Sequence, residues 1–205
     1  MTLANLNITP ADRLDLPALT ELWNLAYSGY AVPLNFSSEM LQRHIDRSGA
    51  SLAISRVLWR EGVACGISLA ALRGERGYLA GFGIGPEARR QGLGALLLEA
   101  QVEAWHQQGL KQARLEVMEA NPARHLYAQA GFVAQRRLLL LQGALSNPAQ
   151  AAVAALQPVP LDTLSRLHDR LNAASPPTWR REWTTVRQAV QAPGASAWQL
   201  TGGGA

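Results

Sequence analysis

A strand, a glycine-rich turn and a helix follow one another in residues 77–109, and this succession constrains the fold more than any other feature. Residues 77–84 read GYLAGFGI, an apolar run typical of a strand. From residue 93 the apolar positions recur at the spacing of one buried helix face, and the helix is expected to end near Gly109. The predicted face consists of Leu93, Leu96, Leu97, Ala100 and Ala104.

The residues before this segment predict an antiparallel meander that follows a pair of helices. The strand-like runs 51–59, 63–72 and 77–84 are joined by short turns, REG and RGERG. Ahead of them, a short strand at residues 6–8 precedes one helix with an apolar stripe and a second helix that starts at Ser38 as its N-cap. The stripe of the first helix consists of Leu19, Leu22, Trp23 and Ala26.

The residues after this segment add two strands and one helix. Residues 113–118, ARLEVM, and 132–141, FVAQRRLLLL, are strand-like. Between them, Asn121 and the proline after it predict a helix start, and Gly131 predicts its end. The expected fold is α/β, of the α+β type, with a mixed and mostly antiparallel sheet flanked by helices.

Composition and charge narrow the classes of function. Hydrophobic residues make up 48% of the 205 residues and charged ones 17%, which favours a folded protein. The net charge of +4 is spread over separate arginine pairs, which suits a phosphate ligand better than nucleic acid. The single cysteine, Cys65, and four histidines without ligand spacing give no metal site. No signal peptide or bilayer-length apolar run is visible, so we expect a cytoplasmic protein without membrane contact.

Residues 81–94 hold two overlapping glycine patterns that could each bind phosphate. Gly83-x-Gly85-x-x-Ala88 matches the dinucleotide fingerprint, with Glu103 further on. In a dinucleotide-binding fold, the helix begins among the glycines and the acidic residue lies at the end of the next strand. Glu103 instead falls in the middle of the predicted helix. A dinucleotide enzyme is therefore the weakest of the functions that we consider.

The second pattern, Arg89-x-x-Gly92-x-Gly94, fits a phosphate better. A helix that starts near Gly92 directs its first backbone N–H groups toward a ligand, and the helix dipole favours negative charge there. Gly92 and Gly94 leave those donors uncovered, while Arg89 and Arg90 could supply countercharge. Taken alone, the same residues could equally form a solvated connection.

Three segments together resemble the GNAT superfamily of acyl-CoA N-acyltransferases: IGPEARRQGLGALLLEA, then LEV followed by Asn121, then LYAQAGF. The resemblance covers roughly residues 5–141. It implies that acetyl-CoA is the co-substrate and that the loop wraps its pyrophosphate, while the strand before the loop pairs with pantetheine. The residues implied to bind it are Phe82, Gly83, Ile84, Arg89, Arg90, Gln91, Gly92, Leu93, Gly94, Ala95 and Asn121.

The resemblance also implies two catalytic residues. Tyr127 aligns with a tyrosine that protonates the departing thiolate, although its place on an apolar helix stripe equally suits a core residue. Glu116 aligns with a general base; it could equally be an outward-facing glutamate in a salt bridge. Asn121 lies near pantetheine in the family, and helix capping explains it as well. On the first helix, Trp23, Tyr27 and Tyr30 could line the acceptor site or pack in the core.

Two departures from the family pattern affect these implications. The stretch NPARHLY has one residue fewer than usual between the asparagine and the tyrosine, which turns Tyr127 by about 100° relative to Asn121 on a helix. In addition, the final hairpin strand that walls the acceptor site in the family is not legible after Leu141.

The remaining residues, 144–205, form a partial second repeat or an extension of the domain at 1–143. A gapless shift of 145 places Leu16, Leu19 and Leu22 on Leu161, Leu164 and Leu167. The same shift superposes a shared GAS at residues 49–51 and 194–196, which favours a duplication. The extension is expected to be helical.

The sequence thus predicts an N-acetyltransferase that moves an acetyl group from acetyl-CoA to a primary amine by direct transfer. The acceptor is expected to be a small molecule or a peptide, and homodimerisation is left open. The alternative is an acyl-CoA-binding sensor or regulatory module without turnover, which needs the loop but not Glu116 or Tyr127.

Overall fold

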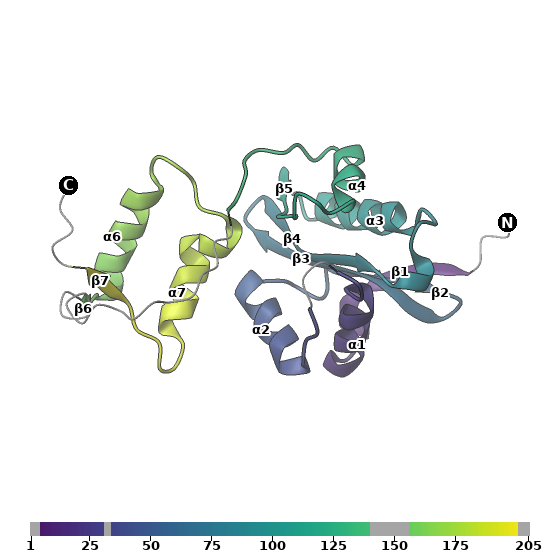
Figure 1. Ribbon diagram of the computed structural model, residues 1–205, viewed down its shortest axis with the longest axis horizontal. Helices are drawn as coiled ribbons and strands as arrows, with labels where there is room; N and C mark the ends of the chain where they lie inside the picture. The colour runs from purple at the N-terminus through teal and green to yellow at the C-terminus, as the bar shows by residue number, and fades with distance from the viewer. Residues whose placement is uncertain (1–4, 31–33, 140–155, 201–205) are drawn as a thin grey trace. The chain divides into compact units, whose positions relative to one another are not determined.

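The computed structural model describes residues 5–30, 34–139 and 156–200 (Figure 1). The chain divides into two compact units, Met1–Val133 and Ala134–Ala205. The domain boundary expected at residue 143 lies outside the described residues. None of the helices in the described ranges is both long and apolar enough to cross a bilayer.

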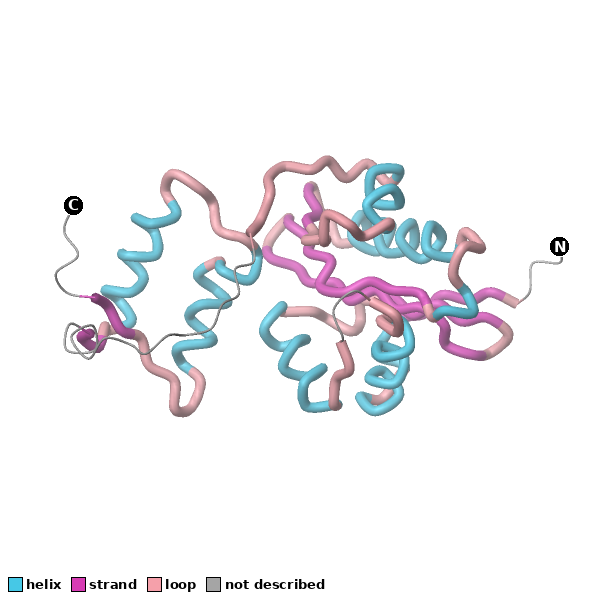
Figure 2. Tube along the Cα trace, viewed as in Figure 1, coloured by secondary structure: helices cyan, strands magenta, loops and turns pink. Residues whose placement is uncertain are grey.

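The first unit is built on a five-stranded sheet in the order β1-β2-β3-β4-β5, drawn in magenta between the helices in Figure 2. The first four strands pair antiparallel, and β5 joins β4 in parallel. The strands are β1 Leu6–Pro10, β2 Arg56–Arg60, β3 Val63–Arg73, β4 Arg76–Ile84 and β5 Gln112–Arg114. The predicted meander and mixed sheet are confirmed.

Two pairs of helices cover opposite faces of this sheet (Figure 1). One pair comprises α1, Leu16–Ala26, and α2, Ser38–Ser48; the other comprises α3, Leu93–Gln107, and α4, Ala123–Gln129. The four expected stripe residues of α1 are all buried. The predicted cap of α2 was one residue late, because the Ser37 hydroxyl accepts the Met40 N–H at 3.2 Å.

The buried face of α3 differs from the predicted one. Leu96 is 43% exposed and Ala100 only half-buried, whereas Leu98, Gln101 and Trp105 are buried. Gln101 can lie in the core because its amide is satisfied, with Ser68 Oγ donating to Oε1 at 2.9 Å and Nε2 donating to the Ile54 carbonyl at 3.0 Å. Apolar spacing alone does not reveal such a buried polar residue.

Three predicted strands are shorter or absent. Residues 51–55 form a turn before β2, and β5 ends at Arg114 instead of residue 118. Residues 132–139 form no strand, and residues 140–141 lie outside the described ranges. Val133 and Leu139 are 82% and 77% exposed, so this segment has neither the strand neighbour nor the burial that stabilises a strand.

The second unit contains a small antiparallel pair, β6 Leu156–Pro158 and β7 Trp198–Leu200. Two helices lie between these strands in the sequence, α6 Leu161–Asn172 and α7 Trp183–Gln191. The expectation of helices in this region is confirmed. None of the residues of α6 is buried.

Candidate functional site

The edge of β4 that faces β5 is open over most of its length. β5 pairs with β4 only from Arg76 to Tyr78, and no other described strand joins that edge from Leu79 to Ile84. The two strands therefore separate beyond Tyr78. An exposed strand edge presents backbone N–H and C=O groups to a partner, and Phe82 and Ile84 lie on this stretch. Side chains already bond to some of its backbone groups: Tyr27 to the Phe82 N–H and Arg89 to the Ile84 carbonyl.

The glycines of β4 make room for a helix. A Cβ at Gly81 would lie 2.4 Å from the Trp23 ring, and one at Gly83 would lie 3.0 Å from Ala26. Trp23 and Ala26 of α1 fill the space that these missing side chains leave. Because Gly83 lies within β4 and Glu103 within α3, the dinucleotide pattern has neither its turn nor its strand-end acid.

The predicted phosphate loop follows β4 and a short 3-10 helix, Pro86–Ala88, and leads into the N-terminus of α3. Gly92 has φ of 78°, in the left-handed region that favours glycine, and no atom lies within 4 Å of where its Cβ would be. In the part of the chain that the structure describes, the backbone N–H groups of residues 90–94 have no hydrogen-bond acceptor; the first bonded one is Ala95, to the Gly92 carbonyl at 3.0 Å. These amides open a helix of 15 residues, which makes them donors suited to an anion.

Arg89 holds the loop in place. Its guanidinium donates to the carbonyls of Ile84 at 2.8 Å, Ala26 at 3.1 Å and Ser28 at 2.7 Å. The last two carbonyls lie at the C-terminal end of α1, where a cation also complements the helix dipole. Both Arg89 and Arg90 are exposed, but Arg89 ties the loop to α1 through these bonds, so Arg90 is the better source of countercharge.

The other predicted loop residues have distinct local roles. Gln91 braces the turn, with Nε2 donating to the Glu87 carbonyl and Oε1 accepting from Arg60, both at 2.8 Å. Leu93 is buried and anchors the start of α3, while Ala95 is exposed. A Cβ at Gly94 would reach only ordinary contact with Leu126, at 3.4 Å.

Tyr127 lies in the core beside the open edge. It is 8% exposed, and its ring centroid lies 6.0 Å from that of Phe82 and 6.1 Å from that of Phe132. Burial, followed by the nearby Tyr27 and Tyr30, raises the pKa of its hydroxyl well above the ordinary value. Both interpretations of the sequence, a core residue and a site residue, fit this position.

Asn121 caps α4 and reaches toward α1. Its Oδ1 accepts the Ala123 N–H at 2.9 Å, and its Nδ2 donates to the Tyr30 hydroxyl at 3.4 Å. The capping role predicted from the sequence is confirmed. The bond to Tyr30 brings α4 and the residues that follow α1 together near the same strand edge.

Tyr27 is the residue whose position the sequence least revealed. It follows α1 directly, and its hydroxyl accepts the Phe82 N–H at 3.0 Å. Its ring packs on Trp23 at 4.4 Å and on Tyr30 at 5.5 Å between centroids. The aromatic spacing along α1 marked these three residues as core or acceptor lining, but no local signal connects Tyr27 with Phe82.

Glu116 lies outside any strand and is exposed. The strand on which it was expected ends two residues earlier, at Arg114. The position within a strand that the sequence predicted for Glu116 is therefore wrong.

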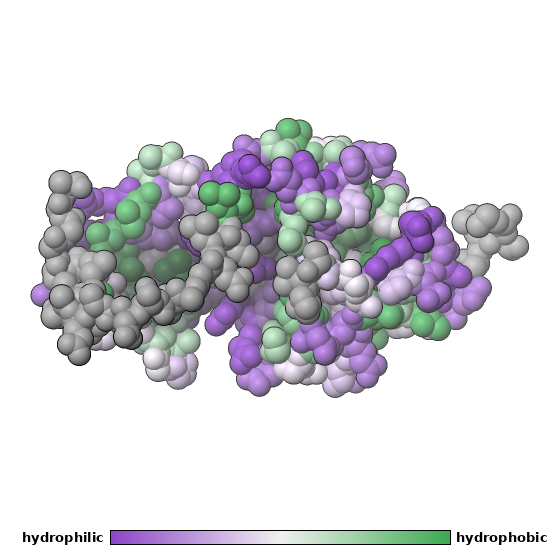
Figure 3. Space-filling model, viewed as in Figure 1, coloured by the Kyte–Doolittle hydropathy of each residue, from purple (hydrophilic) through white to green (hydrophobic). Residues whose placement is uncertain are grey.

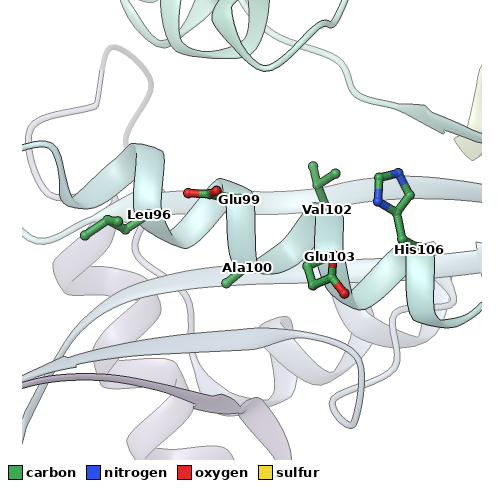
Figure 4. A pocket seen from close by; sticks show the side chains of 6 residues that line it. All are labelled: Leu96, Glu99, Ala100, Val102, Glu103 and His106. Atoms are coloured by element: carbon green, nitrogen blue, oxygen red, sulfur yellow. The ribbon is translucent and has the colours of Figure 1, made fainter.

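A separate hollow of about 460 Å³ lies on the outer side of α3. All six side chains that line it project from this one helix (Figure 4), and two of them are the carboxylates Glu99 and Glu103. Negative charge makes this hollow unsuited to phosphate. Among the described residues, no group of three or more His, Cys, Asp or Glu side chains is arranged to hold a metal ion.

The fold recurs in solved acetyltransferases. The ribosomal-protein-S18-alanine N-acetyltransferase from Escherichia coli is 23% identical with a TM-score of 0.54, covering 64% of this chain and 79% of that one. A GNAT family acetyltransferase from Streptococcus pneumoniae is 25% identical with a TM-score of 0.52, over 64% and 87%. An aminoglycoside acetyltransferase from an uncultured soil metagenomic sample is 18% identical with a TM-score of 0.52, over 70% and 97%.

A search of curated proteins finds no match to the sequence. The sequence profile of the acetyltransferase (GNAT) family, however, matches residues 16–132, which is more than half of the chain. The matched range runs from the start of α1 to just beyond α4 and includes the open edge of β4 and the loop before α3. The chain therefore belongs to the acetyltransferase (GNAT) family.

Proposed function

We propose that this protein transfers an acetyl group from acetyl-CoA to a primary amine, by direct transfer while both substrates are bound. One observation carries the proposal: the open edge of β4 is followed, after the short 3-10 helix Pro86–Ala88, by the unpartnered amides of residues 90–94 at the start of α3. A strand edge followed by a helix N-terminus offers an extended ligand first backbone pairing and then an anion site.

These groups fit the chemistry of acetyl-CoA. The N-terminus of α3 and the exposed Arg90 suit the pyrophosphate, and the edge from Leu79 to Ile84 suits the amides of pantetheine. When bound, acetyl-CoA supplies an acyl group activated as a thioester. Arg89 contributes by fixing the loop against α1 rather than by contacting phosphate.

The reaction needs a donor for the acyl oxygen, a proton donor for the leaving sulfur and an acceptor for the proton of the amine. Backbone N–H groups between Phe82 and Ile84 are proposed to bind the acyl oxygen, with the Phe82 N–H shared between this oxygen and the Tyr27 hydroxyl. Tyr127 is the proton donor that the family implies, and Glu116 the base; the exposure of Glu116 suits proton transfer through water. The acceptor is proposed to be a small molecule or a peptide, and the location cytoplasmic, in keeping with the single cysteine.

The test combines turnover with a charge placed in the loop. The intact protein is incubated with acetyl-CoA and a panel of amines and peptides, and released CoA thiol is measured. Gly94→Asp adds a negative charge to the first turn of α3, next to the amides of the proposed phosphate site. Acetyl-CoA affinity should therefore fall at least about tenfold, a loss of about 1.4 kcal/mol. The added Cβ meets only ordinary contacts, so the fold should persist.

His106→Glu is the matched control, because it adds the same charge to the exposed far end of α3. It should leave acetyl-CoA affinity unchanged. Equal affinity in both variants and the unmodified protein would contradict the proposed phosphate site. Tight acetyl-CoA binding without thiol release from any amine would instead favour the sensor or regulatory module.

A further inference from the structure

The hydroxyl of Tyr27 occupies the open edge of β4. Phe82 pairs with Ser68 of β3 on one side, and its N–H donates to Tyr27 Oη at 3.0 Å. This amide lies beyond Tyr78, where β5 no longer accompanies β4. The lack of a side chain at Gly81 helps the hydroxyl to reach this place, since a Cβ there would lie 3.3 Å from Oη.

This position brings Tyr27 to the reacting atoms of the proposed transfer. A thioester carbonyl bound at the edge between Phe82 and Ile84 comes beside the Tyr27 hydroxyl, which lies 3.0 Å from the Phe82 nitrogen. The thioester sulfur is one bond from the carbonyl carbon, so it also comes within reach of Oη. Geometry of this kind is the first requirement for a general acid.

The hydrogen bond from Phe82 also suits Tyr27 chemically. A backbone N–H that donates to the phenolic oxygen stabilises the negative charge left on that oxygen after its proton has moved. The side chain is half-buried rather than enclosed, which leaves it a route for taking up another proton.

Tyr127 is less suited to the same task. Its ring is enclosed between Phe82 and Phe132, and burial is the main reason that its pKa is raised. An acid whose proton is held so firmly gives it up poorly to a thiolate. Its place in the buried cluster with Leu98 and Trp105 gives it a structural role instead.

We propose that Tyr27, rather than Tyr127, protonates the departing thiolate; this inference rests on the proposed acetyl transfer. The amine nitrogen forms a bond to the acyl carbon, and the carbon–sulfur bond breaks with its electron pair remaining on sulfur. The sulfur takes the hydroxyl proton of Tyr27. The proton lost by the amine returns through water to the Tyr27 oxygen, so that the enzyme is regenerated.

Three single hydroxyl deletions test the assignment in the full chain. Tyr27→Phe should lower kcat by about 10²–10⁴-fold, the range of general acid catalysis, with acetyl-CoA affinity kept within about threefold. Tyr127→Phe should lower kcat less than about tenfold. Tyr78→Phe removes a hydroxyl from the part of β4 that is paired with β5, away from the open edge, and its loss should also remain small.

A readout without turnover comes from the four tyrosines of the chain. With ¹³C at the ring carbon that bears the hydroxyl, each gives one NMR signal, which the phenylalanine variants assign. Saturating CoA should shift the signal of Tyr27 and leave that of Tyr78, which lies where β4 is paired, in place.

The assignment is overturned if Tyr127→Phe lowers kcat more than Tyr27→Phe does, or if saturating CoA leaves the Tyr27 signal unmoved. These results differ from a failure of the proposed function itself. In that case the unmodified protein would bind acetyl-CoA and release no thiol with any amine, whatever the variants do.

Discussion

Residues 6–60 and 156–200 have the same order of elements, a strand, two helices and a strand, but the first stretch buries many more residues; in the described part of the second, only Trp179 and Thr185 are buried. The helices α1 and α6 begin at Leu16 and Leu161, and α2 and α7 begin at Ser38 and Trp183, each pair 145 positions apart. In both stretches the outer strands pair antiparallel. These equal distances support the hypothesis of an internal repeat, first suggested by the gapless shift of the sequence.

Local details also recur at this distance. Gly49 and Gly194 follow the second helix of each stretch with φ of 69° and 77°. A side chain of the first helix bonds the carbonyl two residues before the second helix in both cases: Asn24 to Phe36 at 2.9 Å, and His168 to Arg181 at 2.8 Å. The two side chains do not correspond fully, because the shift of 145 places Asn24 on position 169 and not on His168.

The difference lies in what covers the first helix. The stripe of α1 is buried, with Trp23 against Gly81 of β4, whereas none of the residues of α6 is buried and Leu171 is 80% exposed. The face seen in Figure 3 shows the surface of the first unit as a mixture of polar and apolar residues. The same apolar spacing therefore produces a core only where strands such as β3 and β4 stand opposite it.

The largest effect is expected at the matched leucines Leu19 and Leu164. Leu19 is fully buried, so Leu19→Ala should lower the free energy of unfolding of the first unit by about 2–5 kcal/mol. Leu164 is half-buried, so Leu164→Ala should cost the second unit less than about 1.5 kcal/mol. Hydrogen exchange measured by mass spectrometry on peptides from each unit separates the two values. Equal losses would break the contrast between the two helices.

A smaller effect is expected where α1 meets the sheet. Gly81→Ala places a methyl group against the Trp23 ring, and this overpacking should cost about 1–3 kcal/mol in urea unfolding. Gly94→Ala is the control, because its methyl group would meet only ordinary contacts. If Gly81→Ala were as stable as the unmodified protein, close approach would not explain the burial of α1.

The smallest effect concerns the two glycines that follow the second helices. Gly49→Ala and Gly194→Ala each force a side chain into the left-handed region in open space, so each should cost about 1 kcal/mol. Peptide-level hydrogen exchange should show one local loss in each unit, of similar size. A loss at Gly49 alone would weaken the repeat hypothesis.

Much of the first unit was predictable because its signals are local. The strand-like composition of the meander, the turn glycines, the apolar stripe of α1 and the cap at Asn121 depend on neighbours a few residues away. The strand predicted at residues 132–141 is absent from residues 132–139 because a strand depends on distant residues. A strand needs another strand beside it, and sequence composition does not say whether one is present.

In the candidate site, too, the features that depend on neighbouring residues were predictable and those that depend on distant residues were not. The phosphate loop was found from the sequence because glycine at positions 92 and 94 and a helix start are local features. The role of Arg89 was not, because its three carbonyl partners include two that lie more than 60 positions away. The exposure of Glu116 follows from where β5 ends, which depends on its pairing with β4.

The sequence by itself determined the family, the order of helices and strands in the first unit and the loop that opens α3, because short-range spacing and turn chemistry encode them. Only the tertiary structure decided that the glycines of β4 allow α1 to pack closely on the strand, that Arg89 fixes the loop and that Tyr27 accepts a hydrogen bond from the Phe82 amide. The physical reason is distance along the chain. Tyr27 and Phe82 are 55 positions apart, and their hydrogen bond exists only because α1 packs on the glycine face of β4.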